Sequence, residues 1–137
     1  MVGPMDREFT ILIADRNPHV REFLKREMMA EGYQVRLAKS GREVLKWVYH
    51  NEPLDLLILD YDLPDIGGET VMKKVEDRIP TIPVVVHAFP SDCTNYRPVL
   101  SSTVFVEKKG NSVEGLKKIV SDMVRNAYLQ DSDSNNT

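Results

Sequence analysis

Short apolar runs alternate with amphipathic segments five times along the chain. The runs, each of which we expect to form a buried strand, cover residues 10–14, 33–38, 54–60, 84–87 and 104–106. Between the runs, apolar side chains recur at the spacing of a helix. Strands that alternate with helices join through right-handed crossovers, so this order predicts an α/β domain with a doubly wound, five-stranded parallel sheet.

Capping residues mark where the first two helices begin and end. Asn17 can accept hydrogen bonds from the first free N–H groups of a helix, and Pro18 suits its first position. Gly32 predicts the end of that helix. Ser40 and Glu43 have the spacing of a capping box, so we expect the second helix to begin there.

The second half of the chain has a less regular pattern. A third helix is predicted after Gly67 and Gly68, and a last helix after residue 111, where apolar side chains again have helical spacing. Between residues 89 and 102 we expect a helix weakened by Pro90 and Pro98. The 137 residues suffice for one domain, predicted over residues 9–130. Residues 1–8 are expected to be disordered or vector-derived, and the polar residues 131–137 to form a disordered tail.

The apolar run 54–60 ends abruptly in carboxylates. Asp60 would lie at the carboxyl end of a central strand, where open α/β sheets place their binding sites. A carboxylate buried there costs desolvation free energy unless other groups compensate it. The position of Asp60 therefore indicates a functional site.

Charge and composition exclude several classes of partner. The net charge of −3 gives no electrostatic reason to expect nucleic acid or an anionic membrane as a ligand. No run approaches the roughly 18 apolar residues of a membrane-spanning helix. The lone Cys93 cannot form an internal disulfide, which is typical of a reducing cytoplasm, so we expect a cytoplasmic location.

Four motifs in order resemble the receiver domain of bacterial two-component response regulators, over about residues 9–127. They are Asp15 after the first predicted strand, Asp60 followed by Leu63-Pro64, the strand 83–88, and Lys108 after the last strand. The resemblance implies a flavodoxin-like or CheY-like (βα)5 fold with strand order 2-1-3-4-5. It also implies a phosphoryl group accepted on Asp60 and bound by Lys108.

The resemblance further implies a Mg²⁺ site and a pair of switch residues. Asp15, Asp60 and the backbone carbonyl of Asp62 would be the metal ligands, since Mg²⁺ prefers hard oxygen donors. Ala88 and Phe105 stand at the two switch positions, where receivers have a Ser or Thr and an aromatic residue.

Three residues depart from the pattern of the family. Arg16 stands where receivers usually have a second acid, and our hypothesis is that its guanidinium occupies the volume of the metal and pairs with Asp60. Ala88 lacks the hydroxyl group that would bind the phosphoryl oxygens. Lys109 replaces the proline that usually follows the lysine, so we expect a rebuilt turn there.

The function implied by the resemblance is that of a receiver domain in a two-component phosphorelay. It would not be an enzyme, and it would signal through contacts with a histidine kinase or phosphotransfer protein and with a downstream output protein. One alternative is a phosphorylation-independent pseudo-receiver that acts as an interaction module. A second is a flavodoxin-like nucleotide binder, which the carboxylate of Asp15 disfavours because a phosphate would need a Gly- or Ser-rich loop there.

Overall fold

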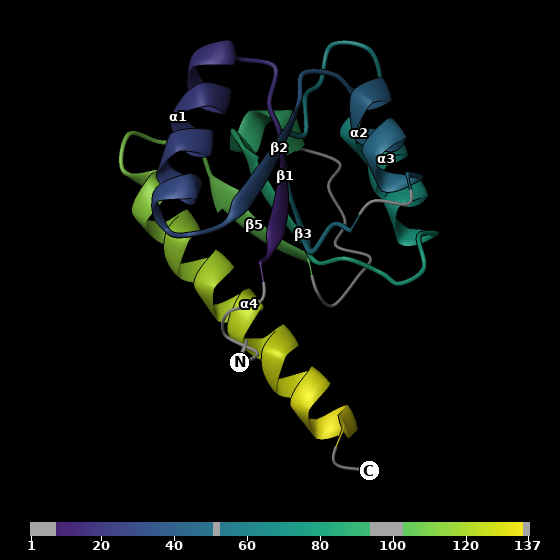
Figure 1. Ribbon diagram of the computed structural model, residues 1–137. Helices are drawn as coiled ribbons and strands as arrows, with labels where there is room; N and C mark the ends of the chain where they lie inside the picture. The colour runs from purple at the N-terminus through teal and green to yellow at the C-terminus, as the bar shows by residue number, and fades with distance from the viewer. Residues whose placement is uncertain (1–7, 51–52, 94–102, 136–137) are drawn as a thin grey trace.

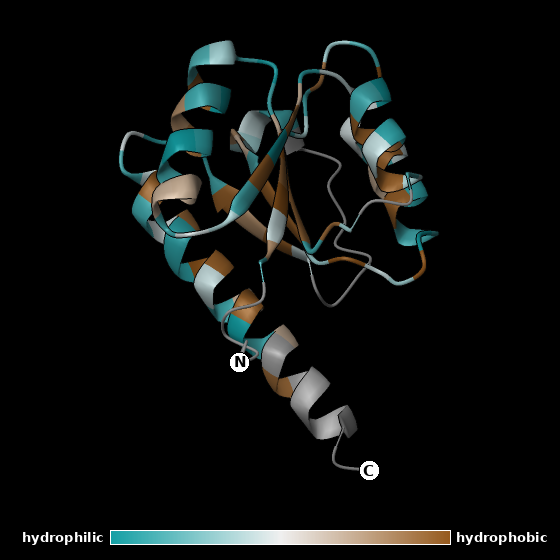
Figure 2. Ribbon diagram, in the orientation of Figure 1, coloured by the Kyte–Doolittle hydropathy of each residue, from teal (hydrophilic) through white to brown (hydrophobic). Residues whose placement is uncertain are grey.

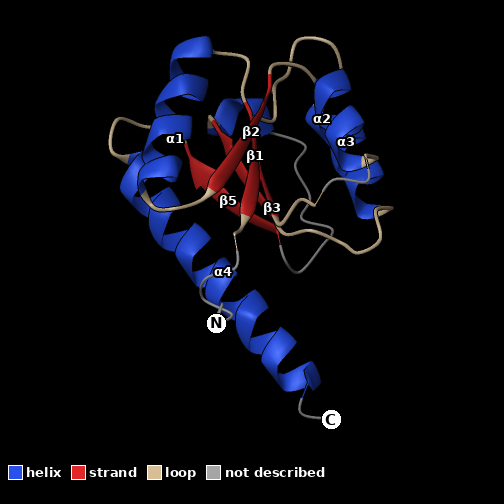
Figure 3. Ribbon diagram, in the orientation of Figure 1, coloured by secondary structure: helices blue, strands red, loops and turns tan. Residues whose placement is uncertain are grey.

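Five parallel strands, numbered along the chain, form the centre of the protein in the predicted order 2-1-3-4-5. The computed structural model describes residues 8–50, 53–93 and 103–135. Figure 3 shows the strands as one sheet between helices. The strands are β1 (Thr10–Ala14), β2 (Gln34–Ala38), β3 (Leu56–Leu59), β4 (Val84–Ala88) and β5 (Thr103–Glu107).

Two helices cover each face of this sheet (Figure 1). On one face lie α1 (Pro18–Ala30) and α4 (Ser112–Asn135), and on the other lie α2 (Gly41–Val48) and α3 (Gly68–Glu76). This is the doubly wound architecture expected from the alternation of strands and helices. Within the described residues, no helix is both long and apolar enough to cross a membrane.

Alternate side chains of each strand enter two separate cores. On β1, Ile11 and Ile13 pack with α1 and α4, whereas Leu12 and Ala14 pack with α2 and α3. All four are at most 1% exposed. Figure 2 shows the resulting hydrophobic strands in the middle of the fold. Burial on both faces explains why these strands are continuous apolar runs rather than alternating ones.

The predicted caps form. The Asn17 side chain accepts from the N–H groups of His19 and Val20, with Pro18 at the first helical position. Gly32 has φ +98°, and its N–H donates to Met29 O in the turn that ends α1. The N–H of Glu43 donates to Ser40 Oγ at 3.2 Å, while the Glu43 carboxylate accepts from Lys39 N–H, one residue earlier than in the predicted capping box.

The structure differs from the sequence prediction at two places in the second half. Helix α4 continues to Asn135, so the tail predicted to be disordered from residue 131 is helical as far as the structure describes it. Once a helix has formed, each further residue adds a hydrogen bond without a new nucleation cost. In the segment predicted as a weak helix, the structure describes a 3₁₀ turn at Pro90–Cys93, and residues 94–102 lie outside the described residues, as do 1–7.

Candidate functional site

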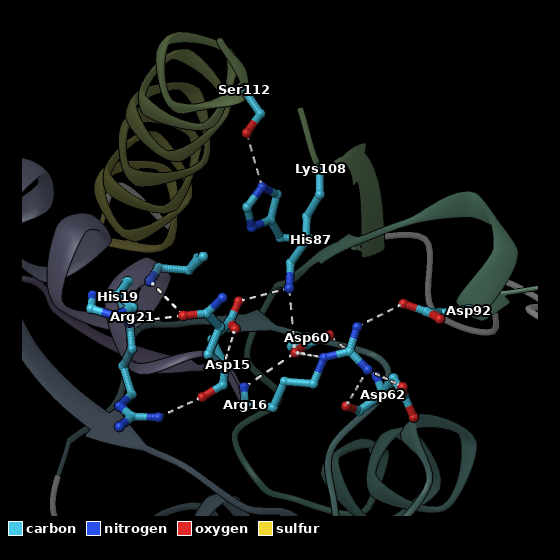
Figure 4. A network of polar contacts seen from close by, with 12 residues as sticks. Asp15, Arg16, His19, Arg21, Asp60, Asp62, His87, Asp92, Lys108 and Ser112 are labelled. Carbon is cyan, nitrogen blue, oxygen red and sulfur yellow. Dashed lines mark hydrogen bonds and ion pairs between the residues drawn. The ribbon is translucent and has the colours of Figure 1, made fainter. Parts of the chain in front are cut away.

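Three charged side chains converge where the strands of the sheet end. Asp15 follows β1, Asp60 follows β3 and Lys108 follows β5, so each stands at the carboxyl edge of the sheet. Parallel strands bring these ends together although the residues are far apart in sequence. Figure 4 shows the three side chains pointing toward one another. The predicted site residues Asp15, Asp60 and Lys108 are therefore in contact.

Lys108 forms an ion pair with both buried carboxylates. Its Nζ lies 3.0 Å from Asp15 Oδ2 and 3.4 Å from Asp60 Oδ2. Asp15 is 1% exposed, Asp60 0% and Lys108 8%. The backbone N–H of Lys108 donates to Ala88 O at 2.9 Å, and its Nζ lies 5.6 Å from the centre of the Phe89 ring. These contacts hold the ammonium group over the two acids.

Backbone N–H groups also bind the two carboxylates. Asn17 N–H donates to Asp15 Oδ1 at 2.8 Å, and Asp62 N–H donates to Asp60 Oδ1 at 3.3 Å. Arg16 N–H donates to Asp60 Oδ2 at 3.2 Å. These hydrogen bonds give the buried carboxylate oxygens polar partners in place of water.

The guanidinium of Arg16 lies beside Asp60, as our hypothesis placed it (Figure 4). Its Nε is 3.7 Å from Asp60 Oδ2, and one terminal nitrogen binds both the carboxylate and, at 3.4 Å, the backbone carbonyl of Asp62. The other terminal nitrogen lies 3.3 Å from Asp92 Oδ2. Burial lowers the pKa of Arg16, but the charges of the three acids raise it more, so its pKa lies above the usual value.

The structure adds two residues that the sequence did not place at the site. Asp92 comes from the 3₁₀ turn after β4, and Ser112 begins α4. Neither belongs to a periodic pattern or a motif, so no signal in one sequence could have found them. Asp92 reaches Arg16 because the turn after β4 lies beside the carboxyl ends of β1 and β3.

The two predicted switch positions differ in their surroundings. Ala88 is fully buried at the end of β4 and has no hydroxyl group to offer. Phe105 lies on β5 beside Val86 and is 36% exposed. The segment between them includes residues 94–102, which lie outside the described residues.

His87 lies next to the charged cluster, on the face of the sheet that α1 and α4 cover. Its Nε2 is 3.0 Å from Ser112 Oγ, and it is 4% exposed. Burial, and then the positive charge of Lys108, lower its pKa to about 4, although Asp60 acts in the opposite direction. The imidazole is therefore neutral at pH 7. It also lines a cavity of about 500 Å³ between α1 and the ends of β4 and β5.

Comparison with known protein families identifies the family to which this fold and this charged site belong. Residues 11–119 match the family model of the response regulator receiver domain. The chain belongs to this family. The predicted resemblance and the predicted strand order are thereby confirmed. The protein is a receiver domain of the two-component type, a family in which histidine kinases and output domains are the interaction partners.

Curated relatives match over part of their length. Response regulator RR06 of Streptococcus pneumoniae is 35% identical over 89 residues, which are 65% of this chain and 40% of that protein. Response regulator MprA of Mycolicibacterium vanbaalenii is 34% identical over 76 residues, 56% of this chain and 32% of that protein. The chain thus matches about a third to two fifths of the length of these relatives.

Solved receiver structures have the same fold. The response regulator receiver domain protein of Clostridium thermocellum superposes with a TM-score of 0.77 at 18% identity, covering 89% of this chain and 98% of that one. TrrA of Thermotoga maritima, solved in complex with Mg²⁺ and BeF, superposes with a TM-score of 0.69 at 29% identity. The match covers 84% of this chain and 98% of TrrA.

The oxygens predicted to bind Mg²⁺ are already bound by cations or N–H groups of the chain. Receiver domains typically bind Mg²⁺ in this pocket. Here Lys108 contacts Asp15 and Asp60, and Arg16 contacts Asp60 and the carbonyl of Asp62. Among the residues that the structure describes, no group of three acidic, His or Cys side chains is arranged to hold a metal ion. The donor set as it stands therefore does not fit Mg²⁺.

Proposed function

We propose that this receiver domain accepts a phosphoryl group on Asp60 and signals by protein contact rather than by catalysis. The observation that supports this most directly is the buried contact of Asp60 with Lys108, at 3.4 Å. A carboxylate must approach an anionic phosphoryl donor, so it needs a fixed cation beside it. Asp60 has that cation at the carboxyl edge of the sheet, where the half-exposed side chain of Arg16 lies between it and solvent.

The reaction is a group transfer to a carboxylate oxygen. Asp60 attacks the phosphorus atom of a phosphohistidine, the P–N bond breaks, and the imidazole leaves with the bonding electrons and takes up a proton. The product is an acyl phosphate on Asp60. Lys108 then binds phosphoryl oxygens in place of the carboxylate that it binds now.

The phosphoryl donor would be a histidine kinase or a phosphotransfer protein in the cytoplasm. The signal would pass to an output protein, which is either separate or covalently linked to this domain. The family supports both classes of partner. RR06, MprA and NtrC of Proteus hauseri are response regulators or transcriptional regulators, and this chain matches part of each.

The experiment is incubation with phosphoramidate and Mg²⁺ followed by intact-mass measurement. We expect one added phosphoryl group in the wild type and none in Asp60→Asn, which keeps the shape of the side chain. Asp77→Asn is the matched control, since it makes the same change at an exposed acid that ends α3, outside the charged cluster, and it should retain the adduct. No adduct in the wild type, or an adduct in Asp60→Asn, would overturn the proposal.

A further inference from the structure

We propose that Arg16 takes the place of the metal ion, so that this site holds a phosphoryl group without a divalent cation. This inference rests on the proposed phosphorylation of Asp60. Its basis is the geometry of the guanidinium, which contacts the carboxylate of Asp60 and the carbonyl of Asp62 at once. These are two of the three groups that the family pattern assigns to the metal.

Each of the two buried acids already has a cation beside it. Lys108 contacts both Asp15 and Asp60, and Arg16 contacts Asp60 from the exposed side, so neither carboxylate lacks a positive partner when no metal ion is bound. A divalent cation would have to break ion pairs in a site where Asp15 and Asp60 are fully buried. Breaking a buried pair costs more than an exposed one because water cannot replace the lost partner.

Contacts on several sides hold Arg16 in place. Its backbone N–H donates to Asp60, while its terminal nitrogens bind Asp62 and Asp92 on the far side of the guanidinium. The planar group is thus fixed between the buried acid and two more exposed ones. A guanidinium presents paired N–H donors that match the oxygens of a phosphoryl group, which an ammonium group or a bare carboxylate cannot do.

Phosphorylation changes the charge of the site. Asp60 loses its own negative charge when it becomes an acyl ester, and the phosphoryl group adds about two. The site therefore gains about one negative charge, next to Lys108 and Arg16. Since the side chain of Arg16 is 36% exposed, it can exchange its contacts with Asp62 and Asp92 for phosphoryl oxygens without rearranging the core.

The test compares phosphorylation in Mg²⁺ and in EDTA. Asp60 attacks the phosphorus of phosphoramidate, the P–N bond breaks, and ammonia leaves with a proton from water. We expect the rate and extent of adduct formation in wild-type protein to agree within about twofold in the two buffers. Arg16→Asp restores an acid at this position, and we expect its adduct to form at least tenfold faster in Mg²⁺ than in EDTA.

Arg26→Asp is the matched control. It makes the same change of charge on the exposed side of α1, where Arg26 stacks on Phe23, and it should behave like the wild type in both buffers. A general charge effect would instead make both variants dependent on Mg²⁺, and that result would overturn the role of Arg16.

A Mg²⁺ titration followed by NMR separates this inference from the proposed function. We expect the amide signals of Asp15, Arg16 and Asp62 in the wild type to be unchanged at millimolar Mg²⁺, and to shift in Arg16→Asp. Saturation of the wild type at or below millimolar Mg²⁺, or an adduct that forms only with Mg²⁺, overturns the inference and leaves Asp60 as the acceptor. No adduct in either buffer overturns both proposals.

Discussion

The pocket at the carboxyl edge of the sheet has a buried half and an exposed half, and they are built differently. The buried half is Asp15, Asp60 and Lys108, of which none is more than 8% exposed. The exposed half is Arg16, Asp62 and Asp92, whose side chains are 36%, 56% and 20% exposed. The buried half matches the pattern of the receiver family, whereas the exposed half contains its main departure, Arg16.

The difference in burial predicts that the two halves tolerate substitutions differently. An unpaired charge in the buried half would lose its hydration free energy with no ion pair to compensate the loss, so each group there requires its partners. In the exposed half, water solvates a charge whether or not it is paired, and an exposed ion pair contributes little to stability. A substitution such as an arginine for an acid is therefore tolerated on the exposed side while the buried side keeps its geometry.

The largest effect on stability is expected from Lys108→Met. It leaves the buried carboxylates of Asp15 and Asp60 without the ammonium group that contacts both, at 3.0 and 3.4 Å. Removing one partner from a buried ion pair typically costs 3–5 kcal/mol, and because Arg16 still contacts Asp60 we expect about 3 kcal/mol. Urea unfolding at pH 7 measures the loss of free energy.

The control for this prediction is a double-mutant cycle with Asp60→Asn. When one of the two acids is already neutral, the cost of Lys108→Met should fall by at least about 1 kcal/mol. Equal costs in the two backgrounds would show that the pair with Asp60 adds nothing, and that Lys108 stabilises the fold through Asp15 or through the packing of its carbon chain.

Much of the fold, and Asp60 in the buried half of the site, could be predicted from strong periodic signals in the sequence. Asp15 and Lys108 were assigned through the resemblance to the receiver family. Apolar runs buried on both faces identified the strands, and Asp60 was found because an acid directly follows such a run. The parallel sheet then brings the ends of β1, β3 and β5 together. No knowledge of side-chain contacts was needed for this step.

The exposed half could be predicted only in part. The substitution of Arg16 was visible against the family pattern, and so was its expected pairing with Asp60. Its contact with Asp92 was not, since that depends on the 3₁₀ turn after β4 and has no sequence signature. The pairing of His87 with Ser112 was also missed, because a hydrogen bond between a strand and a helix 25 residues later leaves no periodic pattern.

The next largest effect on stability is expected from His87, whose pKa is lowered by burial and then by the charge of Lys108 in the buried half. The histidine has a pKa of about 4 in the folded protein and about 6.5 when unfolded, because of burial and the charge of Lys108. Between these two pKa values the unfolded chain binds more protons than the folded protein, so the folded state becomes less stable as the pH falls. We expect a loss of about 2 kcal/mol from this group between pH 7 and pH 5.

Unfolding curves at pH 7 and pH 5 for the wild type and His87→Phe test this. The variant should lack that part of the loss, whereas the same change at the exposed His50 should leave the pH dependence of the wild type intact. In Lys108→Met, NMR titration should show a higher pKa for His87, since one cause of its depression is removed. A His87→Phe variant that loses as much stability as the wild type would contradict the prediction.

The smallest effect on stability is expected from Arg16→Gln, although the same residue has the central role in the metal-free site. Its ion pairs are exposed or reach Asp60 only at 3.7 Å, so we expect a loss of about 0.5 kcal/mol in urea unfolding at low salt. At about 1 M NaCl, where the screening length is about 3 Å, this loss should nearly vanish, while the loss in Lys108→Met should persist because its pairs are buried. A loss in Arg16→Gln as large as that in Lys108→Met would mean that the guanidinium belongs to the buried half and is too firmly held to exchange its partners for a phosphoryl group. A small, salt-sensitive loss together with a large effect on metal dependence would instead identify Arg16 as a residue placed for binding rather than for folding.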